Sequence, residues 1–283
     1  VGSEMCIRDR EYRDEVFEID VPFSGEGKSL VKTTNRFSGI DWGTESIAIV
    51  YDYWWDTRNR KAYIFNPSSP NSKPKTLYDR NYQDIYSDPG SFLKIRNIFN
   101  KSVLMLHKGS AFLRGAGFSE EGQFPFIDKV NITTLNKSRV YQSKFTDKVE
   151  AIQDYNPATN ELIVRIESPT EYPNYYSKKT NGKRLAKITD FENPFEELKN
   201  VKKEVISYKR DDGLELSGIL YLPVNYDEEK KEKAPMILWA YPREFKDRNS
   251  ASQSNKNANR FTSPYYGSMV YWVTKGYVVL DDA

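Results

Sequence analysis

Few side chains in this 283-residue sequence combine the type and the spacing that covalent chemistry needs. A serine hydrolase requires a serine nucleophile, a histidine base and a carboxylate that orients the histidine. The sequence has one histidine, His107, and no Gly-x-Ser-x-Gly elbow, the turn that presents the nucleophile in α/β-hydrolases. Because His107 lies at the end of an apolar run, we interpret it as a structural histidine at the end of a strand.

Other residues with chemical potential also lack the spacing of a known site. The acidic residues Asp52, Asp56, Asp84 and Asp88 do not follow the pattern of a calcium loop. The glycines between residues 109 and 117 fit no phosphate-binding motif, since no strand leads into a Gly-x-Gly-x-x-Gly helix start. We therefore predict no metal site and no cofactor.

The overall composition excludes several classes of protein. The 42 basic and 40 acidic residues give a net charge of +2, and no basic stripe with interleaved aromatics is present, so we predict no nucleic-acid partner. No apolar run reaches the length of a membrane span. An aromatic content of 14% favours a packed core over disorder.

The first ten residues, Val1–Arg10, read VGSEMCIRDR and resemble translated sequencing adapter. We interpret them as a non-native tail and leave them out of the fold prediction. They contain Cys6, the only cysteine, so the remaining chain has no disulfide and no cysteine ligand for a metal. That composition is compatible with a secreted, a periplasmic or a cytoplasmic protein.

Residues 11–199 alternate short β-rich runs with polar turn clusters. The runs cover residues 46–51, 62–65, 74–79, 129–132, 138–141, 151–155, 161–166, 175–177 and 184–190. Strand–turn–strand units that recur every few tens of residues predict the blades of a partial β-propeller. A β-sandwich is the alternative that the same pattern allows.

From about residue 200 the pattern changes. Two β-rich runs, 204–208 and 214–222, flank Asp211-Asp212-Gly213 and predict a hairpin, because glycine supplies the positive φ of the turn. The apolar run 236–241 predicts a strand buried on both faces. A helix opening at Pro264 and stopping at Gly276, followed by a strand at 277–280, completes a βαβ pattern. We expect a parallel sheet that is left unfinished, with an unpaired edge.

The residues of this second part resemble a known family. The stretch 208–223, YKRDDGLELSGILYLP, is similar to the segment that enters the catalytic domain of prolyl oligopeptidase family peptidases. The stretch 234–246, APMILWAYPREFK, resembles the glutamyl endopeptidase branch of that family, and residues 49–58, 77–80 and 84–91 have counterparts there in the same order. The resemblance implies a mostly β fold: a partial β-propeller in residues 11–199 and the incomplete N-terminal part of an α/β-hydrolase domain in residues 200–283.

The same resemblance implies a function for the intact protein. It would be a serine peptidase that cleaves a peptide or protein substrate by acyl transfer, and its Ser-His-Asp triad would lie beyond residue 283. His107 precedes the hydrolase part in the chain and so cannot be the base of that triad. We expect this fragment to be inactive by itself. An aminopeptidase or an acyl-peptide hydrolase of the same family is an alternative, as is a propeller binding module with a degenerate hydrolase domain.

One catalytic residue of the family has a matching position in this sequence. Tyr241 corresponds to the family tyrosine whose hydroxyl donates to the oxyanion of the tetrahedral intermediate, although Pro242 replaces the small residue of several branches. Without the resemblance, Tyr241 is an ordinary tyrosine at a strand end. Arg243 and Lys246 are candidates to bind an acidic substrate side chain, and the alternative for such loop cations is simple solvation.

Overall fold

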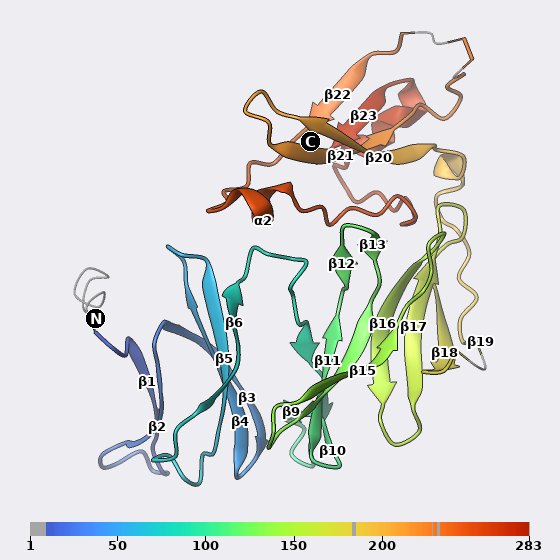
Figure 1. The fold of residues 1–283 in the computed structure, drawn as a ribbon. Helices are drawn as coiled ribbons and strands as arrows, with labels where there is room; N and C mark the ends of the chain where they lie inside the picture. Colours follow the sequence, from blue (N-terminus) through green and yellow to red (C-terminus); the bar gives the residue numbers. More distant parts are fainter. Residues whose placement is uncertain (1–9, 183–184, 228, 231–232, 283) are drawn as a thin grey trace. The chain divides into compact units, whose positions relative to one another are not determined.

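Short β-strands dominate the computed structural model, which describes residues 10–182, 185–227, 229–230 and 233–282 (Figure 1). Most of the predicted tail, residues 1–9, therefore lies outside the described part. The chain forms two compact units: unit 1 contains the described residues up to 84 together with 91–113 and 128–138, and unit 2 contains 85–90, 114–127 and 139 onward. The predicted domain boundary at residues 199 and 200 stays a prediction.

The first strands form a hairpin and a four-stranded antiparallel sheet in unit 1. The hairpin consists of β1 (Asp14–Glu18) and β2 (Lys28–Thr33), and the sheet consists of β3 (Arg36–Thr44), β4 (Ile47–Trp54), β5 (Asn59–Phe65) and β6 (Lys75–Asn81). Because the four strands pair in chain order, the sheet is a meander, the sheet type of a propeller blade.

Two larger sheets follow: a five-stranded sheet with the order β10-β11-β14-β15, in which β7 also pairs with β11, and a four-stranded sheet with the order β16-β17-β18-β19. The strands of this part of the chain are β7 (Ser91–Phe92), β8 (Lys94–Arg96), β9 (Ser102–Leu104), β10 (Leu106–His107), β11 (Ser110–Gly115), β12 (Phe118–Ser119), β13 (Gly122–Gln123), β14 (Phe126–Asn131), β15 (Lys137–Gln142), β16 (Val149–Asn156), β17 (Glu161–Glu167), β18 (Asn174–Lys179) and β19 (Ala186–Lys187). The last run was predicted to extend over 184–190, of which residue 184 is not described, and its strand covers Ala186–Lys187 alone.

Strand β4 is buried on both faces. Ala48 and Val50 pack with Leu30 and Phe65 in one apolar cluster, whereas Ile49, between them, packs into a second cluster on the opposite face. All three β4 side chains are at most 1% exposed. An antiparallel sheet that covers one face only would leave alternate residues in water, so burial of both faces is what a blade stacked between neighbours requires.

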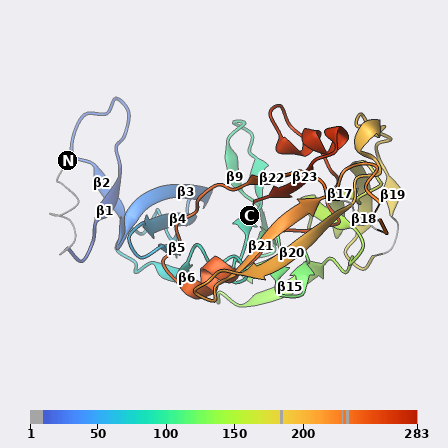
Figure 2. The same cartoon turned by 90° about the horizontal axis from the view of Figure 1, so that it is seen from above.

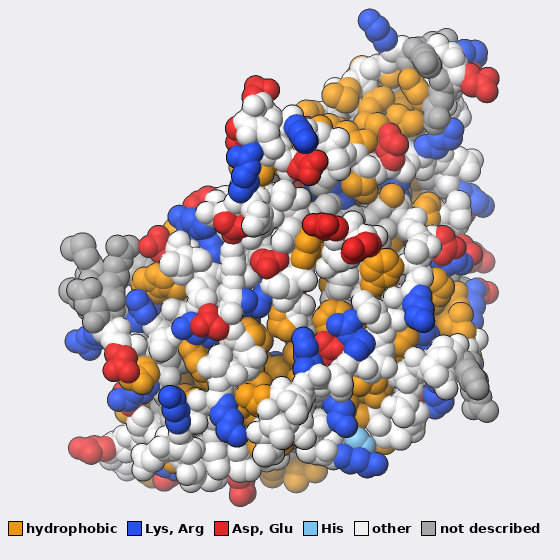
Figure 3. Space-filling view, viewed as in Figure 1, with side chains coloured by type: hydrophobic (Ala, Val, Ile, Leu, Met, Phe, Trp, Pro, Cys, Tyr) orange, Lys and Arg blue, Asp and Glu red, His pale blue; other side chains and the backbone are white. Residues whose placement is uncertain are grey.

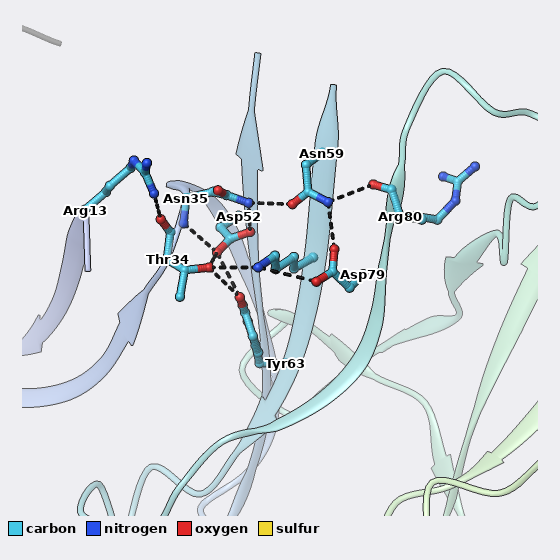
Figure 4. A network of polar contacts seen from close by, with 9 residues as sticks. Arg13, Thr34, Asn35, Asp52, Asn59, Tyr63, Asp79 and Arg80 are labelled. Atoms are coloured by element: carbon cyan, nitrogen blue, oxygen red, sulfur yellow. Dashed lines mark hydrogen bonds and ion pairs between the residues drawn. The ribbon is translucent and has the colours of Figure 1, made fainter. Parts of the chain in front are cut away.

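A polar network around the buried Asp52 ties the strands of this sheet together at one end (Figure 4). The carboxylate of Asp52 accepts hydrogen bonds from the backbone N–H and side-chain amide of Asn35, at 3.0 and 3.1 Å, and from the hydroxyl of Tyr63 at 3.2 Å. Asn59 accepts from the Asn35 amide and donates to Asp79, both at 2.7 Å. These bonds satisfy a charge that burial alone would destabilise.

A mixed sheet forms the last part of unit 2, with the order β20-β21-β23-β22. Its elements, with the short helices around them, are η1 (Glu196–Leu198), β20 (Lys203–Lys209), β21 (Glu215–Tyr221), β22 (Met236–Trp239), α2 (Arg248–Ser252), η2 (Met269–Lys275) and β23 (Val278–Asp281). As predicted, β20 and β21 form a hairpin whose turn needs the positive φ of Gly213, +77°, and β22 and β23 are parallel.

Two predictions for this sheet are wrong. The helix does not open at Pro264: it is a 3₁₀-helix, η2, that begins at Met269 after Ser268 accepts a hydrogen bond from the Val270 N–H. Its stop at Gly276, with φ +83°, is confirmed. Strand β22 was expected to be buried on both faces, yet Leu238 is 58% exposed, because among the described residues β22 pairs with β23 alone.

Burial in the mixed sheet is concentrated where η2 covers it. Val270 and Val273 of η2 pack with Tyr221 of β21 and Val279 of β23 in one cluster. By contrast, apolar side chains gather in the open over β22 on the face seen in Figure 3. No helix among the described residues has the length and apolar character that crossing a bilayer requires.

Candidate functional site

The carboxyl ends of the two parallel strands lie side by side in unit 2. Trp239, the last residue of β22, is in register with Asp281, the last residue of β23. Tyr241 follows the first strand by two residues, and Asp282 follows the second directly. In open sheets with parallel strands, ligands bind outside these ends, so the geometry makes this edge the candidate site.

Tyr241 is largely exposed to solvent at this edge. Its side chain is 74% exposed, and residues 240–246 have no regular secondary structure. Its hydroxyl has no hydrogen-bond partner in the part of the chain that the structure describes. The phenol O–H is therefore free to donate to a bound molecule, although its role as an oxyanion donor remains a proposal.

Arg243 is held by an ion pair that the sequence analysis did not foresee. Its Nη2 lies 3.3 Å from Oδ1 and 3.4 Å from Oδ2 of Asp282. The Nζ of Lys256 lies 3.3 Å from the same carboxylate, and its side chain is only 10% exposed. One carboxylate thus gathers two cations at the end of β23.

A second carboxyl group, that of Asp281, lies one residue before Asp282. Burial raises the pKa of Asp281 above its ordinary value, and the neighbouring negative charge of Asp282 raises it further. The third predicted cation, Lys246, pairs with Glu244 at 3.2 Å. The sequence analysis did not single out the pair Asp281-Asp282. Two acidic residues at the end of a buried parallel strand lie at the edge of a sheet where ligand sites form, so this pair was a signal that the sequence offered.

The other residues considered in the sequence analysis include several that belong to unit 1, whereas this edge belongs to unit 2. His107 is the last residue of β10, as predicted, and is in register with Ser110 of β11 in unit 1. No group of three or more metal-ligating side chains occurs among the described residues. Asp52 and Asp84 belong to unit 1, and neither carries a role in the candidate site.

The segment that follows the site makes polar contacts within unit 2. The side-chain oxygen of Gln253 accepts hydrogen bonds from the backbone N–H groups of Ile85 and Tyr86, at 2.8 and 3.2 Å. Asn257 donates to Gln123 at 3.2 Å, and Asn259 donates to a backbone carbonyl at 2.7 Å. Amide side chains thus fix residues 253–259 to loops that are distant in sequence.

Comparison with known proteins places this arrangement in a family context. No family model matches the chain. Two curated plant proteins do: a probable chloroplastic glutamyl endopeptidase of Oryza sativa subsp. japonica is 33% identical over 98% of the chain, and its counterpart from Arabidopsis thaliana is 31% identical over 92%. The chain spans 31% and 29% of the length of these relatives.

Solved structures give the fold. Oligopeptidase B from Leishmania major aligns with 94% of the chain and 35% of its own length, with a TM-score of 0.53 at 10% identity. Dipeptidyl peptidase 4 from Porphyromonas gingivalis aligns with 90% of the chain and 40% of its own length, with a TM-score of 0.50 at 14% identity. Together with the curated relatives, these matches show that the chain belongs to the prolyl oligopeptidase family and is similar to its plant glutamyl endopeptidases.

Proposed function

We propose that the intact protein is a serine peptidase that hydrolyses peptide bonds through an acyl-serine intermediate. The observation that carries this proposal is the 33% identity to a probable glutamyl endopeptidase across 98% of the chain. We further propose that residues 11–199 form part of a β-propeller, that residues 200–283 begin an α/β-hydrolase domain, and that the serine, acid and histidine of the triad lie beyond residue 283.

The sheet order supports the hydrolase assignment. An antiparallel hairpin, β20 and β21, leads into a parallel pair in which β23 lies between β21 and β22. Mixed sheets of α/β domains commonly carry an antiparallel strand at the edge of an otherwise parallel sheet. The free side of β22 would then receive the next parallel strand, which would also cover Leu238 and the neighbouring apolar residues.

We propose that Tyr241 is an oxyanion donor in this peptidase. When a serine attacks a peptide carbonyl, negative charge develops on the carbonyl oxygen, and a positioned O–H stabilises it more in the transition state than in the ground state. An exposed phenol beside the carboxyl end of β22 has the freedom to meet a substrate. The phenol supplies the hydrogen bond without a change of its own charge.

We propose that Arg243 binds an acidic side chain of the peptide substrate. In the structure its guanidinium already pairs with a carboxylate, that of Asp282. A substrate carboxylate would replace Asp282 in the same pairing, and Lys256 would keep Asp282 neutralised. Exchange of one carboxylate for another costs less than capture of an anion by a cation that must first be desolvated.

The test uses the gene product read through from its source past residue 283. We expect a fluorophosphonate probe to label it and peptide substrates to be hydrolysed, with faster cleavage after Glu than after Gln. Tyr241→Phe should lower kcat about 10²–10³-fold with little change in KM. Tyr266→Phe, a fully exposed tyrosine of the same part of the chain, is the matched control and should retain full activity.

Each part of the proposal has its own contrary result. A product without labelling and without hydrolysis would leave a propeller protein whose partner must be found by binding. Equal kcat in Tyr241→Phe and the wild type would remove the oxyanion role and leave the peptidase assignment intact. Unchanged preference for Glu in Arg243→Gln would remove the specificity role alone.

A further inference from the structure

The hairpin of β8 and β9 in unit 1 is anchored firmly at its base. Lys94, at the start of β8, forms an ion pair with Asp41 of β3 at 2.5 Å. At the end of β9, Leu104 is buried in the cluster that also contains Ile49. The backbone N–H of Met105 donates to the carbonyl of Leu93 at 2.9 Å. Figure 2 shows this hairpin, labelled β9, projecting from the ribbon.

The tip of the hairpin presents two apolar side chains to solvent. Ile98 is 93% exposed and Phe99 is 74% exposed. Neither side chain contributes to a core, so folding gains nothing from their apolar character. Neighbouring apolar residues at the end of a projecting element are a feature of interaction surfaces.

The turn that carries these side chains is closed by hydrogen bonds within it. The side-chain oxygen of Asn97 accepts hydrogen bonds from the backbone N–H groups of Phe99 and Lys101, at 3.0 and 2.9 Å. The backbone N–H of Asn97 donates to the Lys101 carbonyl, and the Asn100 N–H donates to the Asn97 carbonyl, both at 2.9 Å. Arg96 caps the turn, since its Nη1 donates to the Asn100 carbonyl at 2.8 Å.

This bonding favours a lipid surface over a protein surface as the partner. An unsatisfied backbone N–H or C=O costs several kilocalories per mole inside a bilayer, where water is absent. The tip supplies partners for four of its N–H groups from within the turn, so insertion into lipid would leave fewer of its backbone groups unsatisfied. A protein partner has less need of this, because it can offer donors and acceptors of its own.

The charge around the tip matches an anionic surface. The segment 89–119 contains five basic residues, Lys94, Arg96, Lys101, Lys108 and Arg114, and no Asp or Glu. The ammonium of Lys101 has no partner among the described residues, and Arg96 bonds to a neutral carbonyl. Two cations without a carboxylate partner therefore flank the apolar pair in the sequence, as lipid phosphates would require of a tip whose apolar residues enter the acyl region.

We propose that the β8–β9 tip docks the protein on anionic membranes, with Ile98 and Phe99 in the outer acyl region and Arg96 and Lys101 on the lipid phosphates. The inference is independent of the peptidase proposal. Insertion of a hairpin tip is peripheral binding, so it needs no membrane-spanning helix. Because charge and apolar burial both contribute, binding should weaken with salt and depend on both residue pairs.

Sedimentation of the full chain with vesicles tests the proposal. We expect binding to vesicles of phosphatidylcholine with phosphatidylglycerol, and much weaker binding to phosphatidylcholine alone. The double variant Ile98→Ser, Phe99→Ser should lose binding by at least about tenfold. The matched control is Val21→Ser, Phe23→Ser, an equally exposed apolar pair of unit 1, which should bind as the wild type does.

A charge variant and an insertion probe complete the test. Lys101→Glu should weaken binding about fivefold or more, whereas Lys129→Glu, an exposed lysine of β14, should change it little. In Phe99→Trp, tryptophan emission should shift to the blue with anionic vesicles and be quenched by brominated acyl chains. Wild-type binding by the Ile98 and Phe99 double variant, absence of vesicle binding by the wild type, or equal binding to neutral vesicles would each overturn the proposal.

Discussion

Strands β4 and β22 have similar apolar sequences and opposite surroundings. Residues 47–50 of β4 read IAIV and residues 236–239 of β22 read MILW. In β4 the central side chains are fully buried, because strands lie on both sides and apolar clusters cover both faces. Among the described residues β22 has one strand neighbour, and most of its side chains are exposed. Neighbouring strands, rather than the hydrophobicity of the run, therefore decide burial.

Charged side chains also differ between a buried sheet and the exposed edge of the parallel strands. In the sheet that contains β16 and β18, Glu150 and Lys178 are buried together, with Nζ 2.6 Å from Oε2, and Tyr141 donates to the other carboxylate oxygen at 2.6 Å. At the end of the parallel strands, Arg243 and Asp282 pair in partial contact with water. A buried charge must have a partner, whereas an exposed pair forms and breaks at little cost.

Truncation of one apolar side chain in each strand should give the largest difference between them. Ile49→Ala should lower the free energy of unfolding of unit 1 by about 2–5 kcal/mol, since it leaves a cavity in a cluster without access to water. Leu238→Ala should change stability by less than about 0.5 kcal/mol. Urea unfolding followed by tryptophan fluorescence measures both. Similar losses for the two variants would show that β22 is covered in solution.

Lys203, the first residue of β20, is a charged side chain of intermediate burial, and it gives a prediction about how stability depends on pH. Its Nζ donates to the Arg260 carbonyl and, at 3.1 Å, to the Thr262 hydroxyl. Burial lowers the pKa of Lys203 to about 8, below the ordinary value for lysine of about 10.4. Between these two values the unfolded state holds more protons than the folded state, so stability gains with rising pH.

Comparison of two variants isolates this contribution. Lys203→Met has no titrating group at this position, so it lacks the gain in stability that Lys203 gives as the pH rises. The wild type should therefore become more stable relative to this variant as the pH rises from about 8 to about 10. The exposed lysine at the other end of β20 supplies the control, because Lys209→Met should leave the pH dependence as it is in the wild type. Urea midpoints across this pH range are the measurement. A constant difference between wild type and Lys203→Met would contradict the lowered pKa.

Sequence reasoning succeeded for strands with regular apolar residues and for turns that glycine controls. The runs that became β4, β5 and β17 were predicted within a few residues, and so were the Gly213 turn and the Gly276 stop. Strands such as β3, RFSGIDWGT, were missed because glycines and polar residues interrupt the alternation. Strands β7–β9 and β11–β13 were missed as well, because most of them are only two or three residues long and show no alternation.

The candidate site was predictable in one respect and not in another. The resemblance in residues 234–246 singled out Tyr241 and Arg243, and the structure puts both next to the carboxyl end of β22. The partners of Arg243 could not be predicted, because Asp282 reaches it only through the parallel pairing of β22 with β23. Lys256 joins them from a stretch without regular secondary structure, where the sequence carries no periodic signal.

The smallest effect is expected at the carboxylate of Asp282, which pairs with one exposed and one largely buried cation. Asp282 pairs with Arg243, whose side chain is 51% exposed, and with Lys256, whose side chain is 10% exposed. A double-mutant cycle of Arg243→Gln with Asp282→Asn should give a coupling energy below about 0.5 kcal/mol that vanishes in high salt. The cycle of Lys256→Met with Asp282→Asn should give a larger and less salt-sensitive coupling, because water screens that pair less. Equal coupling energies would show that solvent exposure does not govern the strength of ion pairs at the strand ends. The contrast between the buried sheet and this edge would then apply to apolar side chains and not to charged ones.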